Sequence, residues 1–218
     1  MSDAETKALP ERIPVFPLPG VLLLPGGRLP LNIFEQRYLD MTRDAWDSTR
    51  LIGMIQPEDP TDSAFEPALY RVGCAGRITS FDETDDGRYI IVLTGQARFR
   101  IVTELDRETL YRQIVADWQP YLADLGTEDE GGVDRERLLP ALHAYLTLNG
   151  IEVEWRAVEK APATVLVNQL AMVCPFSPGE KQALLEAADL TERSRVMTAL
   201  VEMALLAHQG GDTEGARH

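Results

Sequence analysis

The chain has 218 residues, of which 44% are hydrophobic, as expected for a globular protein with one sizeable domain or two small ones. Its formal net charge of -14 disfavours binding to nucleic acids and anionic membranes, because affinity for phosphate-rich surfaces depends on Lys and Arg. Cys74 and Cys174 have no Cys or His neighbour at ligand spacing, so the sequence predicts no zinc site, no disulfide and a reducing, cytoplasmic setting. No cofactor is expected.

The chain begins with residues 1–12, which are polar and predict a disordered lead-in without a secretory signal. Two extended segments follow, Ile13–Leu18 and Leu29–Ile33, joined by a turn rich in Pro and Gly. This turn does not match a phosphate-binding loop, because the chain has no Gly-Lys pair. Nor does it match a membrane span, because its apolar run ends at Pro25 after four residues.

An amphipathic helix is predicted next, since Phe34, Tyr38, Met41 and Ala45 recur at helical spacing on one face. Asn32 precedes this helix as a candidate N-terminal cap.

The remainder of the first half predicts four strands. Apolar, β-branched and aromatic residues dominate over 51–55, 70–81, 88–102 and 111–118. The second and third of these runs form a hairpin around the turn at 84–87. Gly73, Gly76 and Gly95 predict bulges or sharp bends, as a small and strongly curved sheet requires.

The second half predicts helices. Residues 122–134 are acidic and glycine-rich, which indicates a linker between a β-rich part over 13–121 and a helical part over 135–209. Four helices are expected to begin near Asp134, Pro162, Ser177 and Thr191 and to form a small bundle. Gly210 is the expected end of the last helix, and residues 210–218 predict a disordered tail.

Catalysis is not indicated by the sequence. There is no Gly-x-Ser-x-Gly motif, and the three histidines, His143, His208 and His218, have no recognisable nucleophile partner. The acidic clusters occur in a turn and a linker without calcium-binding spacing, which favours solvated charge. We therefore expect a protein that is not an enzyme.

The order of the segments resembles a known family. IPVFPLPGVLLLPGGRLPLNIFEQRYLDM is followed by YRVGCAGRITSF, by DDGRYIIVLTGQARFRI and by a tail containing VNQLAMVCPFSPGEKQALLEAADLTERSRVMTALVEMAL. From Ile13 to about Ala207 the chain resembles the amino-terminal substrate-binding domain of the Lon protease family, in its free-standing bacterial form without ATPase and peptidase modules. The resemblance implies an α+β fold, in which a PUA-like curved β-barrel subdomain with one amphipathic helix precedes a C-terminal four-helix bundle.

The same resemblance implies a non-enzymatic module that binds proteins or unfolded polypeptides, as an adaptor for proteolysis or protein quality control. The alternative is a small-molecule or RNA-binding PUA-like module. The sequence gives no indication of the oligomeric state.

Several residues are candidates for contact with a peptide or protein partner. They are Leu18, Val21, Leu22, Leu23, Leu24, Phe34, Tyr38, Arg77 and Arg98. If the three consecutive leucines alternate, at least one faces outward and forms an apolar strip for an extended peptide or a partner's edge strand. Phe34 and Tyr38 have packing as their favoured role. A groove between the β-rich and helical parts, lined partly by Arg77 or Arg98, is a second candidate surface.

Overall fold

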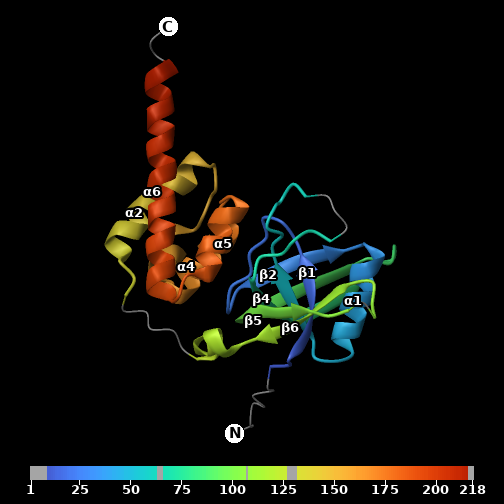
Figure 1. Ribbon diagram of the computed structural model, residues 1–218. Coiled ribbons are helices and arrows are strands. Elements are labelled where there is room, and N and C mark those ends of the chain that lie inside the picture. The colour runs from blue at the N-terminus through green and yellow to red at the C-terminus, as the bar shows by residue number, and fades with distance from the viewer. Residues whose placement is uncertain (1–8, 63–65, 107, 127–131, 216–218) are drawn as a thin grey trace. The chain divides into compact units, whose positions relative to one another are not determined.

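The computed structural model describes residues 9–62, 66–106, 108–126 and 132–215 (Figure 1). The chain forms two compact units, Met1–Gly126 and Thr127–His218, which we call the β-rich unit and the helical unit. The predicted disorder of the first residues and of the extreme C-terminus, and residues 127–131 of the predicted acidic linker, lie outside these described ranges, whereas the start of that linker belongs to a 3-10 helix.

The β-rich unit contains, in its described part, six strands, one α-helix and one 3-10 helix. These elements are β1 (Arg12–Pro17), β2 (Arg28–Ile33), α1 (Gln36–Trp46), β3 (Leu51–Ile55), β4 (Val72–Glu83), β5 (Tyr89–Glu104), β6 (Arg112–Asp117) and η1 (Gln119–Leu125). All six predicted extended segments are present. The mixed α and β class is therefore confirmed.

The six strands form one sheet in the order β2-β5-β4-β3-β1-β6, and β6 pairs in addition with the end of β5. The pairings therefore return from β6 to β5, while β2 extends the sheet beside β5. Only β1 and β3 run parallel among the pairs described. The register between β4 and β5 shifts at Ala75/Gly76, where a bulge was expected, and again at Ile78/Ser80. The PUA-like relationship stays a prediction.

Helix α1 begins later than the sequence indicates. Its N-cap is Glu35, and Asn32 lies in β2 opposite Ile90, so the predicted Asn32 cap is wrong. Phe34 precedes the helix and is 66% exposed, so its predicted place on the inner helical face is also wrong. The buried face is formed by Tyr38, Met41, Thr42 and Ala45.

The helical unit has five helices in its described part, one more than expected. They are α2 (Arg135–Leu148), α3 (Trp155–Lys160), α4 (Ala163–Val173), α5 (Pro178–Glu186) and α6 (Leu190–Gly215). The short α3 was not anticipated from the sequence, and the four-helix bundle stays a prediction.

The helix ends follow local capping chemistry. Asp134 accepts a hydrogen bond from Arg137 N at 3.1 Å, and Ser177 forms the expected capping box with Glu180. The cap of α6 is Asp189, whose carboxylate accepts from Glu192 N at 2.8 Å, and not Thr191 as predicted. The helix also continues past Gly210, because glycine weakens a helix without preventing its backbone geometry.

Candidate functional site

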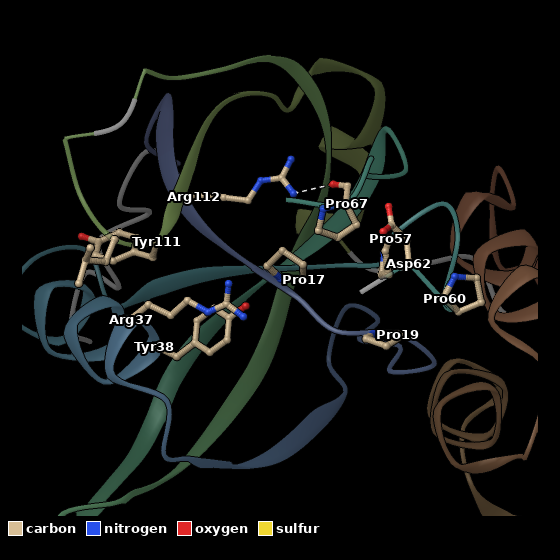
Figure 2. A pocket seen from close by; sticks show the side chains of 11 residues that line it. Pro17, Pro19, Arg37, Tyr38, Pro57, Pro60, Asp62, Pro67, Tyr111 and Arg112 are labelled. Atoms are coloured by element: carbon tan, nitrogen blue, oxygen red, sulfur yellow. Dashed lines mark hydrogen bonds between the residues drawn. The ribbon is translucent and has the colours of Figure 1, made fainter. Parts of the chain in front are cut away.

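A cavity of about 160 Å³ lies in the β-rich unit (Figure 2). Four segments contribute to it: the end of β1, helix α1, the loop after β3 and the start of β6. Five of its lining residues are prolines, namely Pro17, Pro19, Pro57, Pro60 and Pro67. Because proline has a rigid ring and no backbone N–H, these five residues give the cavity apolar walls with few main-chain donors, and Arg37, Asp62 and Arg112 add charged groups.

The proline segments are fixed by hydrogen bonds to the sheet. Leu18 N donates to Ile55 O at 2.9 Å, and Gly20 N donates to the side-chain oxygen of Gln56 at 3.0 Å. Gln56 is only 1% exposed, so this amide ties the loop after β1 to the end of β3 from inside the protein. Pro57 then forms an isolated bridge with Leu69. The proline walls are therefore held in place before any ligand binds.

Tyr38 reaches the cavity from α1 and is 6% exposed. Its ring packs on Phe16, with 4.2 Å between the ring centroids. Its hydroxyl makes no hydrogen bond to any part of the chain that the structure describes. Burial raises the pKa of Tyr38, more than the Arg37 guanidinium lowers it, so the phenol keeps its proton. The cavity thus contains a neutral hydroxyl that can donate.

Tyr111 lies beside the cavity with its hydroxyl already engaged. This hydroxyl donates to the Asp44 carboxylate at 2.7 Å, and burial followed by this bond raises the pKa of Tyr111. Leu110, which is 61% exposed, lies on the rim. Leu110 and Tyr111 also line a wider hollow of about 540 Å³ whose remaining residues are mostly acidic, including Asp40, Asp44 and Glu108.

Two arginines of the lining have carboxylate partners. The Arg37 guanidinium lies 4.5 Å from the centroid of the Tyr38 ring and pairs with Glu35 at 2.9 Å. Arg112 pairs with Glu104 at 2.6 Å and donates to Pro67 O at 2.7 Å, as the dashed line in Figure 2 shows. Their charges are therefore balanced within the protein, and the cavity does not require an anionic ligand.

The predicted apolar strip is not on the surface. Leu22, Leu23 and Leu24 are 3%, 1% and 0% exposed, so the prediction that at least one faces outward is wrong. The reason is a close approach to the sheet: a Cβ at Gly76 would lie 2.7 Å from Leu23, and Gly26 N donates to Gly95 O at 3.0 Å. Glycines in β4 and β5 leave room for this leucine segment, which packs inward. Leu18 and Val21 are half-buried.

The two predicted arginines differ. Arg98 is 2% exposed and bonds to both carboxylate oxygens of Asp124, so its side chain is not accessible to a partner, and the groove between the two parts stays a prediction. Arg77 is half-buried and donates to Thr49 O at 3.1 Å, and its predicted binding role stays a prediction.

Of the predicted contact residues, the cavity includes Tyr38. The prolines, Leu110, Tyr111 and Arg112 were missed. A signal was present in the sequence, since prolines recur at 17, 19, 57, 60 and 67, but their meeting depends on the parallel pairing of β1 with β3.

Two further properties follow from the described parts of the chain. No group of three or more His, Cys, Asp or Glu side chains is arranged to hold a metal ion there. In the same parts, every helix is too short or too polar to cross a lipid bilayer.

Comparison with known proteins gives consistent matches. A sequence model of the ATP-dependent protease La (LON) substrate-binding domain matches residues 12–202. A Lon protease of Anaeromyxobacter dehalogenans is 31% identical over 208 residues, and Lon protease 2 of Myxococcus xanthus is 29% identical over 209 residues. Each alignment covers 88% of this chain but only 23% and 24%, respectively, of the relative, so the chain spans about a quarter of these proteases.

Solved structures agree with these matches. The Lon N-terminal domain protein from Xanthomonas campestris is 26% identical and superposes with a TM-score of 0.62, covering 86% of this chain and 97% of that one. The N-terminal domain of the Lon protease of the Mycobacterium avium complex, at 17% identity, has the same fold with a TM-score of 0.60. The chain belongs to the family of ATP-dependent protease La (LON) substrate-binding domains.

Proposed function

We propose that this chain is a polypeptide-recognition module without catalytic activity of its own, and that it binds through the proline-lined cavity. The observation that carries the proposal is the proline-lined cavity with Leu110 exposed at its rim. Its walls are fixed in advance, which lowers the entropic cost of binding. Membership of a substrate-binding family supports the same function.

The size of the cavity favours a peptide side chain over a free small molecule. Its volume of about 160 Å³ compares with the roughly 300–1,000 Å³ of typical small-molecule sites. One apolar side chain of an extended polypeptide fills such a volume. Apolar side chains are accessible chiefly in unfolded segments, so the ligand we propose is an unfolded polypeptide.

The RNA-binding alternative has less support. RNA recognition needs a positively charged surface with stacking aromatic side chains. The chain has a net charge of -14, and the cavity arginines are paired with Glu35 and Glu104.

Binding of a permanently unfolded polypeptide tests the proposal. Reduced and carboxymethylated α-lactalbumin, labelled with a fluorophore, is titrated with the intact chain. The Leu110→Asp variant removes an apolar contact at the rim and places a charge there, and we expect roughly 5- to 50-fold weaker binding.

A matched control is available in the same unit. Val102 is 54% exposed, against 61% for Leu110, and it does not line the cavity. Val102→Asp makes the same change in charge and should leave the affinity unchanged. Equal losses in both variants, or no binding by the unaltered chain, would contradict a recognition site at this cavity.

We further propose that the module acts as an adaptor that presents bound polypeptides to a protease, in the cytoplasm. The purified chain should then neither hydrolyse ATP nor cleave the bound α-lactalbumin. Measured turnover of either would count against a non-enzymatic role.

A further inference from the structure

Tyr38 points to the kind of segment that the cavity accepts. We infer that its hydroxyl donates a hydrogen bond to a main-chain carbonyl of the bound polypeptide, and that the cavity takes an uncharged, apolar side chain of the same segment. This inference rests on the function proposed above and adds the class of ligand and the residue that positions it.

The first observation is that the Tyr38 hydroxyl, on a mostly buried side chain, makes no hydrogen bond within the described residues. The side chain is 6% exposed and lines the cavity, so its hydroxyl is accessible to a molecule bound there. Figure 2 shows the ring directed toward the centre of the lining residues, beside Arg37 and Pro17. A ligand in the cavity therefore meets a donor that the protein itself leaves unused.

The second observation is that the position of the hydroxyl is fixed. Phe16 packs on the Tyr38 ring at 4.2 Å between centroids, and the Arg37 guanidinium lies 4.5 Å from its centroid. A donor whose ring is held by two such contacts loses little freedom when an acceptor arrives. Tyr38 is thus arranged as a preorganised positioning residue.

The acceptor is best provided by a peptide main chain. The cavity arginines have Glu35 and Glu104 as partners, and Asp62, the remaining charged residue of the lining, also has an interaction within the protein, so a charged ligand group would lose its water without gaining a dedicated counter-charge. A carbonyl is neutral and occurs at every residue of a polypeptide. The proline walls leave an apolar space next to the hydroxyl for one side chain. The ligand class is therefore an extended segment with an uncharged apolar residue.

Replacement of the hydroxyl tests the role of Tyr38. Tyr38→Phe should weaken binding of carboxymethylated α-lactalbumin about 2- to 10-fold, the effect of one net hydrogen bond. The urea concentration at half-unfolding should stay unchanged or rise, because no bond within the free protein is lost. Tyr145→Phe is the matched control: Tyr145 is 5% exposed but lies in the helical unit, and its variant should keep the full affinity.

The class of side chain is tested with short Gly/Ser peptides that differ only in one central residue. The peptide with a central Leu should bind at least about tenfold more tightly than those with Asp or Lys, because a charged side chain loses its hydration in the cavity and the charged residues of the lining are already engaged. Equal binding of the three peptides would overturn the selection for an uncharged residue.

The outcomes separate this inference from the proposed function. If α-lactalbumin binds but Tyr38→Phe keeps the full affinity, the inference fails and polypeptide recognition stands. If Tyr38→Phe loses stability along with affinity, Tyr38 is structural and the inference fails. If the unaltered chain does not bind α-lactalbumin, both fail.

Discussion

Each unit of the molecule buries an arginine side chain, and the two guanidinium groups have different kinds of partner. In the β-rich unit Arg98 is 2% exposed and bonds to the Asp124 carboxylate through Nε at 2.9 Å and a terminal nitrogen at 2.8 Å. In the helical unit Arg193 is 0% exposed and bonds to neutral oxygens, Leu184 O at 3.0 Å and Asn168 Oδ1 at 2.9 Å.

The difference shows two ways to bury one positive charge. The Asp124 carboxylate neutralises Arg98 directly. It also accepts a hydrogen bond from the main-chain N–H of Arg98 at 2.9 Å, which links η1 to β5. Arg193 has instead the carbonyl of Leu184 in the last turn of α5, where the helix dipole places partial negative charge. The first arrangement should fail more severely when its acceptor is removed, because a full counter-charge is lost.

The largest expected effect is that of Asp124→Ala. It leaves Arg98 buried without its carboxylate and should destabilise the β-rich unit by about 3–5 kcal/mol. Cys74, which is fully buried opposite Arg98 in the sheet, provides the measurement. Its rate of alkylation in the native protein should rise steeply, while that of Cys174 in the helical unit stays unchanged.

A double variant tests the reason for this loss. Arg98→Met combined with Asp124→Leu replaces the ion pair by apolar side chains and should recover much of the stability, because no unpaired charge stays buried. Continued exposure of Cys74 in the double variant would show that the pair has a role beyond neutralising its own charges.

A smaller effect is expected from Asn168→Ala. Arg193 loses one neutral acceptor but keeps the Leu184 carbonyl, so the helical unit should lose about 2 kcal/mol. Faster alkylation of Cys174, with Cys74 unchanged, is the expected readout. Asn168→Asp restores an acceptor of nearly the same shape and should be more stable than Asn168→Ala. If Asn168→Asp were instead less stable than Asn168→Ala, the site would exclude a charge in addition to that of Arg193.

Alkaline pH sharpens the comparison at Cys174, which is fully buried in the helical unit. Burial raises the pKa of the Cys174 thiol from 9.0 to about 11. The folded state therefore binds the thiol proton more tightly than the unfolded state does. The free energy of unfolding keeps its full value below pH 9 and falls as the pH rises toward 11, by about 1.4 kcal/mol at pH 10. Urea unfolding followed by helical circular dichroism should show this loss in the unaltered chain but not in Cys174→Ala.

The sequence predicts the local elements well because their causes are local. The turn ending at Gly87, with a φ of 79°, and the Ser177 capping box follow from residues a few positions apart. The predicted start of α1 was too early because Phe34 has helical spacing to Tyr38 but precedes the N-cap, Glu35. The spacing does not show where a helix begins.

The cavity depends on contacts between distant residues, which periodicity does not encode. Gly20 and Gln56, whose hydrogen bond fixes the loop after β1, are separated by 36 positions, and Arg112 and Pro67 by 45. The leucines at 22–24 follow an apolar pattern that fits an exposed strip as well as a buried segment, and the glycines facing them decide the outcome. Tyr38 was found because its helical face was predicted, whereas its unpaired hydroxyl becomes apparent only in three dimensions.

The smallest expected effect is that of Glu202→Ala, which breaks a pair with the same chemistry as Arg98–Asp124 but on the surface. Arg137 bonds to both oxygens of Glu202, at 2.8 and 2.6 Å, yet its side chain is 63% exposed. Water solvates the guanidinium once its partner is removed, so the melting temperature and both alkylation rates should stay unchanged within error. A loss similar to that of Asp124→Ala would mean that the two-point geometry, and not burial, determines what an arginine–carboxylate pair contributes here.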